Sequence, residues 1–215
     1  MSNLRISILN VYSSLIIQMK GQSILFDPVE IDPQKLSDLK TIVVTHEHID
    51  HFDKKLVVAL QKHTGAKVLT TAFVARQLPS LGHSVTAMKA GDSWEIGEEV
   101  RIFAADSKHN ANQGLAFFVT SDLGNIFHPD DSDYYPELAQ LRARYEPLIT
   151  IFAGTSVENM LRISEVMKSR WIITHEYPGL SHFHFPEANV ISLKKNECFV
   201  YPDGYIEEFH YGNDG

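Results

Sequence analysis

The chain has 215 residues, of which 44% are hydrophobic and 21% charged, and its formal net charge at pH 7 is −8. This length and composition are typical of one globular domain, which we expect to span residues 1–215. The acidic balance argues against a dedicated nucleic-acid-binding protein. The single cysteine, Cys198, excludes an intrachain disulfide and a thiolate-rich zinc site.

The apolar segments near the N-terminus are short. Residues 4–8 alternate between apolar and polar, and Leu15-Ile16-Ile17 is too brief for a secretory signal or a membrane-spanning helix. We therefore expect a cytoplasmic protein without a membrane partner. The sequence leaves the oligomeric state open, a homo-oligomer included.

Strand patterns dominate the chain. In order, the predicted strands are residues 4–8, 14–19, 23–26, 41–44, 67–70, 84–88, 94–96, 100–104, 115–120, 125–127, 147–152, 171–174, 197–201 and 205–209. The predicted helices are residues 33–39, a helix capped by Asp53, 72–78, 135–145, and 157–168 with a capping box from Thr155 to Glu158. Runs of strands followed by alternating strands and helices indicate an α/β (α+β) fold. We expect a four-layer αββα sandwich of two mixed sheets with helices outside.

The stretch Thr45-His46-Glu47-His48-Ile49-Asp50-His51 follows directly on the apolar strand at 41–44. Packing does not require this composition, whereas imidazole is the commonest protein ligand of zinc and carboxylates complete such sites. His46 and His48 share a face if the segment is extended, and a turn can bring Asp50 and His51 to a second position nearby. The stretch therefore predicts a metal site for two ions. Position 50 is not His, so the HExxH motif is absent, and we expect Glu47 not to bind metal.

Polar residues also follow three other predicted strands, where loops carry function on a rigid scaffold. His109 comes after the strand at 100–104, Asp130 and Asp131 after that at 125–127, and His175 directly after that at 171–174. These are the candidates for the remaining ligands.

The order His-x-His-x-Asp-His, then His109, an Asp after a strand, and His175 resembles the metallo-β-lactamase superfamily. The hairpin ending in Phe26-Asp27-Pro28 is similar to it too, and the resemblance covers about residues 12 to 180. The short chain and Ile173-Thr174-His175-Glu176-Tyr177-Pro178 resemble the small branch of L-ascorbate-6-phosphate lactonase and uncharacterised metal-dependent hydrolases.

The resemblance implies two divalent cations and assigns their ligands. It places His46, His48 and His109 on one ion, and Asp50, His51 and His175 on the other, with an Asp bridging both. Asp131 is favoured over Asp130 as the bridge because it precedes Ser132, as the family Asp precedes Thr or Ser. Zinc suits this set, and manganese or iron is compatible with its carboxylates.

The chain departs from the family pattern twice. Pro129-Asp130-Asp131-Ser132 stands where the family usually has Gly-Asp-Thr or Gly-Asp-Ser, and Asn10-Val11-Tyr12 stands where the small branch often has Gly-His. Other polar residues are left over. We expect His128 to be structural, His182 and His184 to lie over the cleft as substrate-binding or accessory groups, and aromatic packing to explain Tyr134, Tyr135 and Tyr177.

Two such ions about 3.5–4 Å apart can share a hydroxide that attacks an ester, lactone, amide or phosphodiester. Asp50 can also orient this hydroxide, so we assign catalytic roles to Asp50 and the bridging Asp131. We predict a dinuclear metal-dependent hydrolase of a small, anionic ester, lactone or amide. The alternatives are a phosphodiesterase acting on a nucleotide or nucleic acid and a non-catalytic metal-binding sensor.

Overall fold

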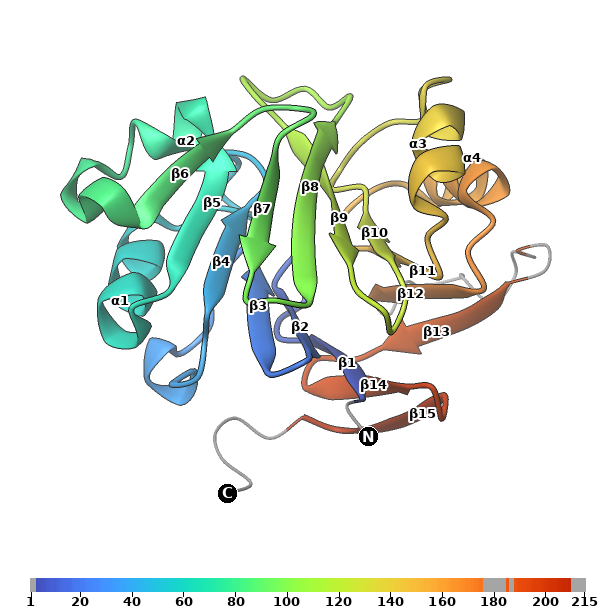
Figure 1. Ribbon diagram of the computed structural model, residues 1–215, viewed down its shortest axis with the longest axis horizontal. Coiled ribbons are helices and arrows are strands. Elements are labelled where there is room, and N and C mark those ends of the chain that lie inside the picture. Colours follow the sequence, from blue (N-terminus) through green and yellow to red (C-terminus); the bar gives the residue numbers. More distant parts are fainter. Residues whose placement is uncertain (1–2, 176–184, 186–187, 210–215) are drawn as a thin grey trace.

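The computed structural model describes residues 3–175, 185 and 188–209, whose strands form two sheets packed face to face (Figure 1). The first sheet has eight strands in the order β15-β14-β1-β2-β3-β4-β5-β6. They span Tyr205–Glu208, Glu197–Tyr201, Leu4–Ile8, Leu15–Met19, Gln22–Phe26, Thr41–Val44, Lys67–Thr71 and Val85–Met88. The second has seven in the order β13-β12-β11-β10-β9-β8-β7. They span Asn189–Leu193, Trp171–His175, Ile149–Phe152, Ile126–His128, Leu115–Thr120, Val100–Asp106 and Ser93–Ile96.

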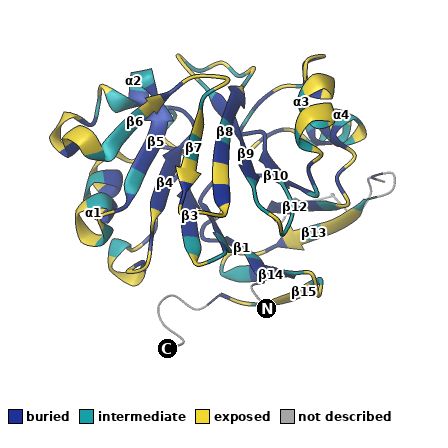
Figure 2. Ribbon diagram, in the orientation of Figure 1, coloured by how far each residue is buried: buried dark blue, intermediate teal, exposed yellow. Residues whose placement is uncertain are grey.

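Helices cover the outer faces of both sheets (Figure 1). On the first sheet, α1 (Lys54–Thr64) and α2 (Ala72–Ala75) pack with the outward apolar side chains of β4 and β5. On the second sheet, α3 (Leu138–Tyr145) and α4 (Val157–Met167) pack with those of β9, β10 and β11. Figure 2 shows buried strands between helices whose outer sides are exposed. The predicted four-layer αββα sandwich is confirmed.

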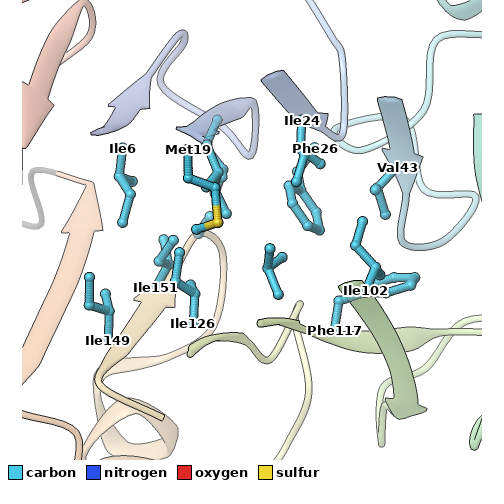
Figure 3. Close-up of a cluster of buried hydrophobic side chains, with 14 of the residues drawn as sticks. Ile6, Met19, Ile24, Phe26, Val43, Ile102, Phe117, Ile126, Ile149 and Ile151 are labelled. Carbon is cyan, nitrogen blue, oxygen red and sulfur yellow. The ribbon is translucent and has the colours of Figure 1, made fainter. Parts of the chain in front are cut away.

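The main core lies between the two sheets. Ile6, Ile24 and Phe26 of the first sheet face Phe117 and Ile151 of the second, and all five are fully buried (Figure 3). Their spacing follows from the two-residue period of a strand, which sends alternate side chains to the same face. This core fixes how the strand ends of one sheet lie against those of the other.

Two local predictions at turns and caps are confirmed. The turn between β2 and β3 places Lys20 and Gly21 at positive φ, the twist that a two-residue hairpin requires. The side chain of Asp53 accepts hydrogen bonds from the backbone of Lys55 and Leu56 and so caps α1.

Three predicted helices are clearly shorter than expected, including the one at 135–145, which begins only at Leu138. The helix at 33–39 is only a 3-10 turn, η1 (Pro33–Lys35), and the helix at 72–78 is reduced to α2. Pro79 disfavours helical backbone at Leu78, and a second 3-10 segment, η2 (Pro79–Ser84), begins there.

Two further details of the prediction were wrong. Ser156, not Thr155, caps α4, because its hydroxyl accepts from the backbone of Asn159. Strand β13 was not predicted, since it is a largely exposed edge strand with a weak apolar pattern. No helix within the described ranges is long and apolar enough to cross a membrane.

Candidate metal centre

The predicted ligands gather where strands of both sheets end. Strand β4 leads into the histidine-rich loop, and β10 leads into the loop of Asp130 and Asp131. The connection from β8 to β9 supplies His109, and β12 ends on His175. Residues far apart in sequence therefore meet because these strand ends are neighbours across the sandwich.

Three imidazoles form the first group. One ligand atom from each of His46, His48 and His109 lies within 4.8 Å of the others. Nε2 of His109 is 3.1 Å from Nδ1 of His48, and the ring centroids of His46 and His48 are 4.5 Å apart. These are the three side chains that the resemblance assigns to one ion.

The second group joins His46, His51 and Asp131, again within 4.8 Å. Oδ2 of Asp131 lies 3.3 Å from Nε2 of His51 and 3.7 Å from Nε2 of His109. Asp131 is therefore the carboxylate that faces both groups. Asp130 points deeper instead, with Oδ1 3.2 Å from Nδ1 of His46.

The donor set and its surroundings fit a divalent cation. Among the described residues, Nε2 of His46 and Oδ1 of Asp131 are buried without a hydrogen-bond partner. The Nδ1 atoms of His46 and His51 lie against Asp130 and Asp27, at 3.2 and 3.0 Å. Metal-binding histidines commonly contact a carboxylate in this way with the nitrogen that does not bind the ion. The Nε2 atoms are thereby left to face one another across the site.

Asp27 anchors the histidine-rich loop through contacts with Thr45 and His51. Its Oδ1 accepts from the backbone N–H of Thr45 at 2.7 Å, and its Oδ2 accepts from the Thr45 hydroxyl at 2.8 Å and contacts His51. Asp27 is fully buried. It was not predicted as a site residue, although it follows β3 as the other candidates follow their strands.

Glu47 stays outside both groups, as predicted, but it has a structural partner. Its Oε1 accepts from the backbone N–H and the side-chain amide of Asn112, both at 2.6 Å. These bonds tie the loop that carries His109 to the loop that carries His48. No sequence pattern predicted this contact.

The carboxylates set the charge of the imidazoles. Burial opposes protonation of His51, yet hydrogen bonds to Asp131 and Asp27 outweigh it and raise the pKa of His51 to about 11. Burial likewise opposes protonation of His46, and Asp130 raises its pKa. Burial lowers the pKa of the partly exposed His109. A cation bound to Nε2 of His51 would replace the proton on that nitrogen, which faces Asp131, and would leave the Nδ1 proton with Asp27.

Asp50 and His175 lie beside these groups rather than within them. Within the described part of the chain, neither belongs to a group of three ligand atoms within 4.8 Å. The Asp50 side chain is 51% exposed, and its Oδ2 is 3.9 Å from Nε2 of His51. The Ser13 hydroxyl donates to the Asp50 carbonyl oxygen.

His175 is a buried, neutral imidazole next to the centre. Burial and the neighbouring rings of His128 and His51 lower the pKa of His175 to about 4. Its Nε2 has no hydrogen-bond partner among the described residues.

The remaining candidates separate clearly. His128 lies buried in β10, with Nδ1 3.1 Å from the Ile151 carbonyl oxygen and its ring against Phe26, in keeping with a structural role. The Tyr135 hydroxyl donates to the Asp106 carbonyl oxygen, and Tyr134 packs under Arg162. His182, His184 and Tyr177 lie outside the described residues.

Asn10 takes a structural position. Its amide donates to Ser14 and to the Val29 carbonyl oxygen, and its Oδ1 accepts from the backbone of Tyr12 and Ser14. These bonds fold the loop after β1 next to the metal-site candidates.

Comparison with known proteins places this constellation in a family. A family model described as the β-lactamase superfamily domain matches residues 10–192, most of the chain. The chain belongs to the metallo-β-lactamase superfamily. It is 26% identical over 194 residues to a UPF0173 protein of Pyrococcus furiosus, covering 88% of this chain and 90% of that protein. It is 24% identical over 162 residues to a UPF0173 metal-dependent hydrolase of Pyrobaculum islandicum, covering 69% and 71%.

Solved structures share the metallo-β-lactamase superfamily fold at low sequence identity. The metallo hydrolase Igni18 of Ignicoccus hospitalis superposes with a TM-score of 0.75 at 15% identity, covering 93% of this chain and 98% of that one. An isothiocyanate hydrolase from Delia radicum gut bacteria gives 0.73 at 15% identity, covering 97% and 100%. At these identities the likeness supports the fold alone.

Proposed function

We propose that this member of the metallo-β-lactamase superfamily is a metal-dependent hydrolase of a small anionic ester, lactone or amide. The observation that carries the proposal is the convergence of His46, His48, His51, His109 and Asp131, with Nε2 of His46 buried and without a hydrogen-bond partner among the described residues. UPF0173 relatives named as metal-dependent hydrolases support the same reaction class.

Each ligand has a proposed place. His46, His48 and His109 would hold one ion, and Asp131 would bridge to a second ion held with His51, Asp50 and His175. Bound divalent cations would supply a Lewis acid and acidify a water molecule, and zinc suits these imidazoles best. Asp27, hydrogen-bonded to Nδ1 of His51, and Asp130, whose charge lies beside Nδ1 of His46, would favour the Nδ1 protons and leave both Nε2 lone pairs for the ions. The half-exposed carboxylate of Asp50 would also accept the proton that the attacking water releases.

A cavity beside His175 supports an anionic substrate. It has a volume of about 300 Å³ and is lined by Asn10, Val11, His175, Leu193, Lys194 and Lys195. Both lysines are exposed. Charges farther away than about 8 Å are largely screened at physiological ionic strength, so this local pair can attract an anion despite the net charge of −8.

The test compares matched substrates. Metal-loaded protein is given pairs of esters, lactones and amides that differ only in a carboxylate, together with phosphodiesters. We expect turnover of the carboxylate-bearing member, its loss in His48→Ala, and a KM raised roughly tenfold when Lys194 and Lys195 are replaced by Ala. Faster turnover of phosphodiesters would contradict the proposed substrate class. Metal-loaded protein inert on the whole panel would contradict hydrolysis.

A further inference from the structure

Asp130 has a backbone conformation that glycine adopts most easily. Its φ is +61°, in the left-handed region, where Asp is tolerated because its side chain is short. It immediately precedes Asp131, at the position where the family pattern has Gly. The chain therefore keeps the turn that a glycine would make and adds a side chain to it.

That added side chain is buried directly behind the candidate metal centre. Asp130 is 0% exposed, and its Oδ1 lies 3.2 Å from Nδ1 of His46 and 3.6 Å from Nδ1 of His51. Its Oδ2 accepts from the Ser107 hydroxyl at 3.3 Å. Oδ1 makes no hydrogen bond among the described residues, so its contacts with the two imidazoles are electrostatic, and the Thr45 hydroxyl lies 3.1 Å from the same Nδ1 of His46.

A buried carboxylate in this position affects the candidate metal centre in two ways. Its negative charge beside Nδ1 of His46 favours the proton on that nitrogen, which leaves the Nε2 lone pair for a cation. Its charge also attracts a cation through the imidazoles, in surroundings less polarisable than water. Asp27 is hydrogen-bonded to Nδ1 of His51 at 3.0 Å, so both buried imidazoles, His46 and His51, have a carboxylate next to Nδ1.

We propose that Asp130 is a positioning residue that tightens cation binding at this centre through His46. The inference rests on the proposed function, because it requires that His46 binds a metal ion. It adds a residue outside the proposed ligand set that raises the affinity of this chain for its metal.

The test is zinc affinity, measured by competition with a chromogenic chelator, on Asp130→Gly. Glycine accepts the left-handed backbone without strain, so this variant removes the carboxylate and leaves the turn. The matched control is Glu146→Gly, which removes an exposed carboxylate at another left-handed residue, the C-cap of α3. Asp130→Asn keeps the side-chain size and an acceptor oxygen but loses the charge.

We expect Asp130→Gly to bind zinc about 10–100-fold more weakly than the wild type, as is usual when a partner of a metal-binding histidine is lost. We expect the zinc affinity of Asp130→Asn to lie between those of Asp130→Gly and the wild type, and that of Glu146→Gly to equal the wild-type value. Unchanged affinity in Asp130→Gly, or an equal loss in Glu146→Gly, would overturn the inference. If Asp130→Gly does not fold, unchanged affinity in Asp130→Asn overturns it instead. A wild type that binds no zinc would contradict the proposed function as well, so the two failures are distinguishable.

Discussion

Oδ1 of Asp131 lies so close to the backbone of Gly154 that a Cβ atom added to this glycine would be 2.0 Å from it. Gly154 follows β11 and has φ of +144°, so the ends of two neighbouring strands, β10 and β11, meet at this contact. The position of Asp131 in the candidate centre therefore depends on a residue without a side chain.

Replacing Gly154 by Ala should displace Asp131 and weaken metal binding at least tenfold, because no real Cβ atom tolerates that separation. The control is Gly91→Ala, which also places Ala at positive φ, here +92°, but meets no atom within 4 Å. Zinc titration of both variants checks the prediction. If both variants bound zinc as tightly as the wild type, Asp131 would not be a ligand of the ion.

Glu47 should matter through the loop that it holds. Glu47→Ala removes the acceptor of two exposed hydrogen bonds from Asn112, which join the loop of His109 to that of His48. We expect a loss of metal affinity of about tenfold as His109 moves away from His48, and a smaller loss in Glu47→Gln, which keeps an acceptor. Chelator competition measures both, and a loss in Glu47→Gln as large as in Glu47→Ala would contradict this account.

The metal-free protein should lose stability above neutral pH. The folded pKa of His51, about 11, lies above its unfolded value of about 6.5, so the folded state binds this proton more tightly. The stabilisation is complete below about pH 6.5 and disappears as the pH rises toward 11. Urea unfolding in the presence of chelator should show this decline, and His51→Asn should flatten it. A wild type equally stable at pH 7 and pH 9.5 would refute the prediction.

Stability should also fall on the acid side, for the opposite reason. The folded pKa of His175, about 4, lies below its unfolded value, so the unfolded chain binds the proton more tightly between about pH 6.5 and 4. Stability should therefore decline as the pH falls through this range. In urea unfolding at the same series of pH values, His175→Asn should show a smaller decline in stability. If the decline were as large as in the wild type, His175 would not be buried as a neutral ring.

Much of the fold could be predicted from local sequence. Most strands were predicted from their apolar patterns, and the Lys20-Gly21 turn and the Asp53 cap act within a few residues. Strand β13 escaped prediction because its register with β12 depends on tertiary pairing rather than on its own exposed residues. The short α2 reflects Pro79 beyond its end.

The candidate site could be predicted only in part, for a related reason. His46, His48 and His51 were recognisable because they crowd one loop, and His109 because it follows a strand. Asp131 was separated from Asp130 only by the family resemblance. The contacts of Asp27 with His51 and of Glu47 with Asn112 join residues 24 and 65 positions apart. No local pattern encodes such pairs. Nor does any local pattern encode the left-handed turn at Asp130, which sends the side chain of Asp130 inward and that of Asp131 toward the imidazoles.

Elemental analysis of the purified protein tests the central claim most directly. We expect about two divalent ions per chain in the wild type, loss of at least one in His48→Ala and in Asp131→Ala, and no loss in His63→Ala, which removes an exposed histidine of α1. A wild type without metal that still hydrolyses its substrate, or a His48→Ala variant with unchanged metal content, would contradict the account.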